Sequence, residues 1–65
     1  MTSRDDYNRL TPWEKGVVSF LEHKDNPAIP AECPYQEGEV GRGLWYSGWD
    51  SMAQQKQREE ERPAS

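Results

Sequence analysis

Cys33 and His23 are the residues in this chain whose types could supply nucleophilic catalysis. A cysteine nucleophile needs a nearby base, and that base needs a third group to orient it. Pro34 follows Cys33 directly, and no orienting group stands out near either residue. We therefore interpret Cys33 as a buried or half-buried structural thiol, which is the commoner role of a free cysteine.

Other kinds of reactive site are poorly supported. Gly41-Arg42-Gly43 lacks the flanking strand, the further glycines and the lysine of a phosphate-binding loop. One Cys and one His cannot complete a closed zinc site, which usually takes four such ligands. No pair among the twelve carboxylates is flanked by apolar residues that would raise a pKa. The sequence therefore predicts a protein that is not an enzyme and that holds no cofactor or metal.

Composition predicts one small domain with a thin core. The chain has 65 residues, of which 32% are hydrophobic, and its formal net charge is −4. So short a chain buries little surface, so we expect marginal stability as a monomer or help from a partner. Both charge signs are spread evenly and no basic stripe exists, which disfavours direct binding of nucleic acid. A single Cys and the lack of a long apolar run predict a cytoplasmic protein that does not bind membranes.

The clearest local signal is a helix start at Thr11. Thr11 can cap the first turn, Pro12 suits the first helical position, and Glu14 completes a capping box. Apolar residues then recur with helical spacing as far as the Asp25-Asn26-Pro27 stop, which predicts a helix over 12–24. Residues 1–10 are polar, and we predict that they are disordered.

A proline-rich linker is predicted over 25–37, and a second helix over 38–60. The second helix has a broad apolar face and then continues as a polar rod, before a tail at 61–65 that we predict to be disordered. Trp13-x-x-Gly16 and Trp45-x-x-Gly48 share a pattern that would let the two helices approach closely if these segments faced each other.

These signals predict an all-α protein, built as a two-helix hairpin with a proline-rich connector and disordered termini. Residues 11–60 would form its single domain. The predicted core consists of Trp13, Val17, Phe20, Leu21, Ile29, Tyr35, Val40, Leu44, Trp45, Trp49 and Met52.

A composite motif runs through the second half of the chain. It consists of Cys33-Pro34-Tyr35 followed by Arg42-x-x-Trp45-x-x-Gly48-Trp49. With the glycine-containing helix before it, this motif resembles the ribosome modulation factor family, which also includes the small CrpP-type proteins and many short phage and plasmid proteins. The resemblance covers about residues 13–53.

The resemblance implies two helices joined by a linker that ends at the Cys-Pro-Tyr motif. It also implies a link to the ribosome, because ribosome modulation factor binds the small subunit and promotes inactive paired ribosomes in slow growth. Mostly structural roles are implied for Cys33, Pro34, Tyr35, Trp45, Gly48 and Trp49. This chain departs from that family in being acidic, in its longer linker, and in one extra residue between Cys33 and Trp45.

We therefore expect a small binding protein that acts on the ribosome or on another macromolecule. Arg42, Tyr46 and Lys56 are the candidate partner-binding residues, because Arg and Tyr are common interface anchors and Tyr46 lies beside the predicted core face. One alternative is a phage or plasmid accessory protein that binds a host protein through its acidic surface. Another is a small drug-phosphorylating enzyme of the kind proposed for CrpP-type proteins, although no phosphate-binding motif supports it.

Overall fold

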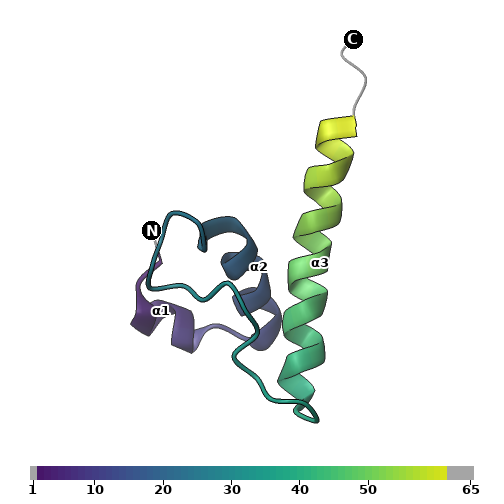
Figure 1. The fold of residues 1–65 in the computed structure, drawn as a ribbon. Coiled ribbons are helices and arrows are strands. Elements are labelled where there is room, and N and C mark those ends of the chain that lie inside the picture. The colour runs from purple at the N-terminus through teal and green to yellow at the C-terminus, as the bar shows by residue number, and fades with distance from the viewer. Residues whose placement is uncertain (1, 62–65) are drawn as a thin grey trace.

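In the computed structural model, residues 2–61 are described, and they form three helices joined by turns and irregular segments, without strands (Figure 1). The helices are α1 (Arg4–Arg9), α2 (Pro12–Glu22) and α3 (Val40–Glu61). The all-α prediction is confirmed. Apart from Glu61, which ends α3, the predicted tail at 61–65 lies outside the described residues.

Helix α1 corrects the prediction that residues 1–10 are disordered. Ser3 caps the helix, because its hydroxyl accepts a hydrogen bond from the backbone N–H of Asp6 at 3.1 Å. Asp5 and Asp6 place negative charge in the first turn, where the helix dipole favours it. The deciding contribution is tertiary, since Tyr7 is only 4% exposed and anchors this short helix to the rest of the chain.

Helix α2 begins as its sequence predicts. Pro12 stands at the start, and the Thr11 hydroxyl accepts from the backbone N–H of Glu14 at 3.3 Å and donates to the Glu14 carboxylate at 2.9 Å. The helix ends at Glu22, two residues before the predicted end. Beyond it, the backbone N–H of His23 donates to the carbonyl of Ser19 at 3.1 Å, and residues 23–25 form a turn.

Helix α3 begins at Val40, two residues later than predicted, because a turn precedes it. Gly38 adopts φ 95°, a left-handed conformation that favours glycine. The carboxylate of Glu39 then accepts from the backbone N–H of Gln36 at 2.7 Å, and the carbonyl of Glu39 accepts from Arg42 at 3.1 Å. These bonds fix the direction in which the chain enters α3.

The predicted hairpin is wrong, because α2 and α3 run side by side in the same direction (Figure 1). The segment 13–17 lies against 45–49, and Phe20, further along α2, meets Trp49, further along α3. A hairpin between antiparallel helices needs only about 2–5 loop residues. The segment 23–39 is much longer, and it carries the chain back to the end at which α2 began.

The predicted core is only partly correct. Ile29 and Trp45 are buried, at 3% and 2% exposure, but Trp13, Leu21, Val40 and Leu44 are exposed by 43, 58, 84 and 44%. The reason is that the helices meet at glycines, so their backbones touch and the large side chains are displaced to the two flanks of the contact. The remaining predicted core residues are half-buried: Val17, Phe20, Tyr35, Trp49 and Met52.

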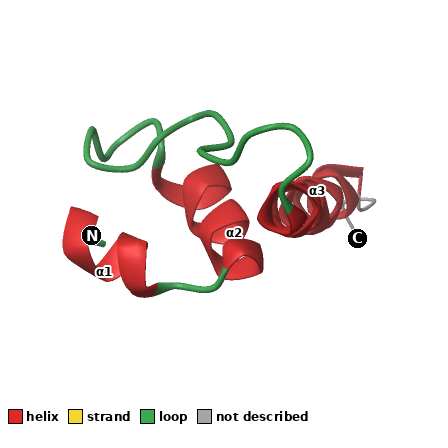
Figure 2. Cartoon of the chain, turned by 90° about the horizontal axis from the view of Figure 1, so that it is seen from below, coloured by secondary structure: helices red, strands yellow, loops and turns green. Residues whose placement is uncertain are grey.

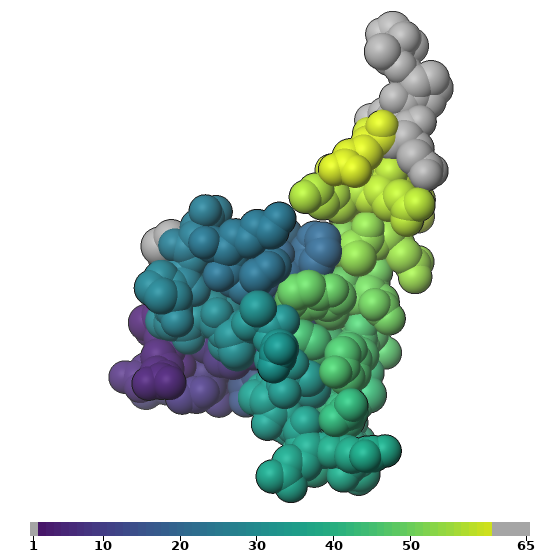
Figure 3. Space-filling view, in the orientation of Figure 1, coloured from purple at the N-terminus to yellow at the C-terminus, as the bar shows by residue number. Residues whose placement is uncertain are grey.

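The connector covers one of these flanks and leaves the other bare. In Figure 2 the loop passes over the upper side of the α2–α3 pair, and among the described residues no segment covers the lower side of α3. Figure 3 shows the same connector packed in front of α2, while the C-terminal half of α3 extends beyond it. The covered flank is where the motif residues gather.

Candidate partner-binding surface

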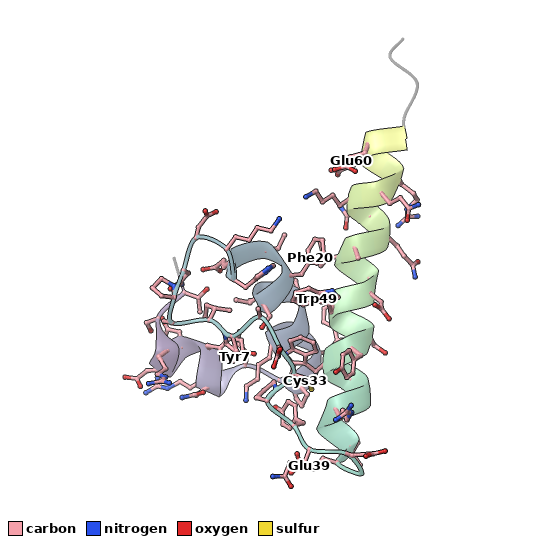
Figure 4. All side chains as sticks on the ribbon, viewed as in Figure 1. Tyr7, Phe20, Cys33, Glu39, Trp49 and Glu60 are labelled. Carbon is pink, nitrogen blue, oxygen red and sulfur yellow. The ribbon has the colours of Figure 1, made fainter. Side chains whose placement is uncertain are left out.

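A shallow depression on the covered flank brings much of the composite motif together. Its lining comes from the connector on one side and from α3 on the other. The lining residues are Ala31, Glu32, Cys33, Arg42, Trp45, Tyr46 and Trp49. Figure 4 shows Cys33 at the edge of the connector that faces α3, beneath Trp49. The spacing of the motif therefore serves to bring two separate segments to one place.

Trp45 is the buried, hydrogen-bonded residue of this depression. Its indole Nε1–H donates to the hydroxyl of Tyr7 at 3.2 Å, and that hydroxyl also bonds the hydroxyl of Ser19 at 3.0 Å. All three side chains are buried. A buried polar group is stable only when it is hydrogen-bonded, so this three-residue network holds α1, α2 and α3 in one arrangement.

Trp49 extends the aromatic packing along α3. Its ring stacks on Trp45 with centroids 5.2 Å apart and planes inclined by 20°. Phe20 meets it edge-on at 5.3 Å, and the His23 ring lies 5.2 Å away. Such aromatic pairs contribute about 0.5–1.5 kcal/mol each beyond the area they bury. Trp45 and Trp49 thus form one aromatic cluster with the residues at the end of α2.

Tyr35 packs against the first turn of α3. Its ring lies against Gly41, where a Cβ would come within 2.9 Å of the ring. Its hydroxyl accepts a hydrogen bond from Lys15 Nζ at 3.1 Å, and the same ammonium lies 5.4 Å from the Tyr35 ring centroid. Pro34, which precedes Tyr35, is exposed.

Arg42 and Tyr46 form a pair on the rim of the depression. The guanidinium carbon of Arg42 lies 5.5 Å from the centroid of the Tyr46 ring, in a cation–π arrangement. Tyr46 also packs edge-on against Trp45 at 5.2 Å, yet it remains 42% exposed. The pair therefore has one side fixed to the core and one side open to solvent.

Lys56, the third predicted partner-binding residue, lies apart from this pair. It lines a different depression, between the end of α2 and the upper part of α3, with Phe20, His23 and Met52. Cys33 and His23 likewise line different depressions. Within residues 2–61 there is no group of three His, Cys, Asp or Glu side chains that could hold a metal ion.

Three residues that matter here were missed from the sequence. Tyr7 belongs to the segment predicted to be disordered, and the predicted core does not include Lys15 or Ser19. Lys15 in fact lies between two aromatic rings, 5.8 Å from that of Tyr7 and 5.4 Å from that of Tyr35. A usable signal was present at α1, because Ser3 and Asp6 have the spacing of an N-terminal cap ahead of Tyr7.

A second polar network ties the start of the chain to the end of α2. The carboxylate of Glu22 accepts from the Thr2 hydroxyl at 2.7 Å and from the Thr2 backbone N–H at 2.8 Å. Asn26 Nδ2 donates to the Thr2 carbonyl at 2.6 Å and to Glu22 at 3.2 Å. Chiefly because the Thr2 hydroxyl donates to it, the pKa of Glu22 lies below its ordinary value of 4.5.

Residues 2–61 thus form three helices with an aromatic cluster and, beside it, a partly exposed Arg–Tyr rim. None of the described helices is long and apolar enough to cross a membrane. Comparisons with protein-family models, with curated proteins and with solved structures found no match to this chain.

Proposed function

We propose that this chain is a small non-enzymatic binding protein of the ribosome modulation factor type, with the ribosome as its partner. The observation that carries the proposal is the position of Arg42 and Tyr46. They belong to the segment that resembles the family, and they stand on the rim of the depression that its motif residues line. Tyr and Arg side chains that are fixed on one side and exposed on the other are typical anchors of macromolecular interfaces.

The negative charge of the chain limits how it can contact the ribosome. With a net charge of −4, the surface as a whole repels phosphate, so binding through a broad phosphate contact is disfavoured. Arg42 stacked on Tyr46 offers a local contact that depends on shape and on one cation. We therefore place the contact with the ribosome at this pair, with the acidic remainder of the chain turned away.

Co-sedimentation with purified ribosomes at physiological salt tests the proposal. The intact chain is expected in the ribosomal fractions, and the Arg42→Ala and Tyr46→Ala variants are expected to be depleted from them. Lys24→Ala is the matched control, because Lys24 is an exposed cation that lines a different depression and its loss leaves the Arg–Tyr pair intact. Absence of the intact chain from every ribosomal fraction would refute ribosome binding.

A second candidate is an accessory protein that binds one host protein, and the acidic composition favours it. An affinity pull-down with and without ribonuclease separates the two candidates. Recovery of ribosomal proteins that is lost after ribonuclease treatment supports the ribosome. Recovery of one non-ribosomal protein that is unaffected by the treatment supports the second candidate instead.

A further inference from the structure

One face of α3 is exposed, uncharged and partly apolar. Four exposed residues of α3 have the spacing that places side chains along one side of a helix. We call the surface they form the outer α3 face, and its residues are Val40, Leu44, Ser47 and Ser51. Val40 is 84% exposed and Leu44 is 44% exposed. Between Val40 and Gln55 the sequence has two charged residues, Arg42 and Asp50, and neither falls on this line.

The apolar surface continues from α3 onto α2. The carbonyl of Trp13 lies against Gly48, which is one helical turn after Leu44, so Trp13 and Leu44 stand at similar heights on the helix pair. Trp13 is 43% exposed. The connector runs over the opposite side of the pair and leaves this surface bare (Figure 2).

We propose that the outer α3 face is covered by the same face of a second copy of this chain, with the two α3 helices antiparallel. The proposal does not depend on the ribosome, because Arg42 and Tyr46 project from a different side of α3. A two-fold interface must be complementary to itself. A two-fold axis near Ser47 meets that condition, because it sets the large Leu44 of each copy opposite the small Ser51 of the other.

The charges at the two ends of α3 select the antiparallel orientation. Arg58 continues the line of the outer α3 face, and Glu37 stands just before α3. With the axis near Ser47, Arg58 of one copy comes beside Glu37 of the other, which is an attractive pair. In a parallel dimer Arg58 would instead lie beside Arg58 of the other copy, and like charges repel at that distance.

The size of the surface is compatible with a dimer. A stable interface buries roughly 800 Å² on each partner, which is about one sixth of the 4978 Å² of accessible surface on this chain. Helix α3 alone is ~33 Å long. Its C-terminal half stands clear of the other helices (Figures 1 and 3), so it is available to lie beside the Val40 end of the second copy.

Sedimentation equilibrium over about 1–200 µM protein, a range that spans typical weak to moderate dissociation constants, tests the proposal. The intact chain is expected to approach twice its monomer mass of 7.6 kDa. Leu44→Glu and Ser47→Arg are each expected to raise the dissociation constant at least about 30-fold, because each buries an unpaired charge. Tyr46→Ala, on another side of α3, is the control. Circular dichroism confirms that each variant retains its helices.

A mass that stays at the monomer value over the whole range would overturn the dimer, and so would a dimer that tolerates both charged variants. Orientation is tested separately by disulfide formation under oxidised glutathione in a Cys33→Ser background. A mixture of Glu37→Cys and Arg58→Cys chains is expected to cross-link, whereas neither chain alone should do so. Cross-linking of either chain with itself, without cross-linking in the mixture, would overturn the antiparallel arrangement.

Discussion

The carbonyl oxygen of Trp45 lies where a Cβ at Gly16 would have to be, so the two helix backbones touch at this point. The reverse contact is equivalent, since the carbonyl of Trp13 lies where a Cβ at Gly48 would be. Both contacts use the Trp-x-x-Gly pattern, which occurs once in α2 and once in α3. Because the two helices run in the same direction, the two copies of the pattern can lie opposite each other. The contact at Gly16 therefore resembles the contact at Gly48.

Gly16→Ala and Gly48→Ala are each expected to destabilise the protein severely. The added Cβ meets backbone atoms, which cannot rotate aside as a flexible side chain can. Overpacking commonly costs about 1–3 kcal/mol, and more where nothing yields. A chain of this length has a total stability of only about 3–10 kcal/mol. Urea denaturation followed by tryptophan fluorescence measures the loss of stability. An unfolding midpoint equal to that of the intact chain would contradict the close backbone contact between α2 and α3.

Gly43→Ala is expected to have the opposite effect. Gly43 lies in α3, as Gly48 does, and a Cβ at Gly43 meets nothing within 4 Å. Alanine stabilises a helix interior by about 1 kcal/mol relative to glycine. The same urea titration should therefore give a higher midpoint for this variant, and a lower midpoint would show that residue 43 has a neighbour in solution.

Tyr7→Phe tests the buried network at Trp45. The substitution keeps the ring but removes the hydroxyl, and this leaves the indole N–H of Trp45 and the hydroxyl of Ser19 without their partner. Leaving such buried groups unpaired costs about 1–3 kcal/mol. Tyr46→Phe is the control, because among residues 2–61 the hydroxyl of Tyr46 has no hydrogen-bond partner. Equal thermal stability of the two variants would contradict the network.

Glu22→Gln is expected to lower the melting temperature by a few degrees at pH 7 and to have little effect at pH 3. Hydrogen bonds from Thr2 hold the pKa of Glu22 below 4.5 in the folded protein. A depressed pKa stabilises the folded state above the unfolded value, and that contribution is lost as pH falls through the folded pKa. Thermal unfolding from pH 7 to pH 3 should therefore show the two proteins converging below about pH 4.5. A difference in melting temperature that is the same at every pH would argue against the Thr2 contact.

Arg42→Ala and Tyr46→Ala are expected to separate binding from folding. Both side chains lie on a rim, and Tyr46 is substantially exposed, so each substitution should change stability by no more than about 1 kcal/mol. The same variants should lose ribosome binding if the proposed function holds. Urea denaturation run beside the co-sedimentation assay shows whether a loss of binding is simply a loss of fold.

The sequence was sufficient for the features that depend on local chemistry. Thr11, Pro12 and Glu14 predicted the start of α2 correctly, because a capping box acts within one helical turn. The shared Trp-x-x-Gly pattern also predicted correctly which turns of the two helices meet. Burial of Ile29 was also predicted correctly, and Ile29 is the one branched aliphatic residue of the segment 25–37.

The predictions that were wrong depend on the relative direction of the helices and on contacts between residues far apart in the sequence. Glycine spacing allows close approach in either orientation, so it could not distinguish a hairpin from parallel helices. That error in direction also misplaced the core, since Trp13, Val40 and Leu44 fall on a flank that the connector never reaches. Helix α1 was missed because Tyr7 is held by Ser19 and Trp45, which lie 12 and 38 residues further along the chain.

The same-direction packing of α2 and α3 has a consequence for how fast the protein folds. Each helix can form from local contacts, but Trp13 meets Gly48 only after all of the chain between them has closed into a loop. Closing such a loop costs on the order of 3 kcal/mol in chain entropy, and this cost grows only with the logarithm of its length. Inserting a few residues into the connector should therefore barely slow folding. Deleting a few should also leave the return possible, because about five extended residues span the ~16 Å length of α2 and the segment 23–39 is far longer than that.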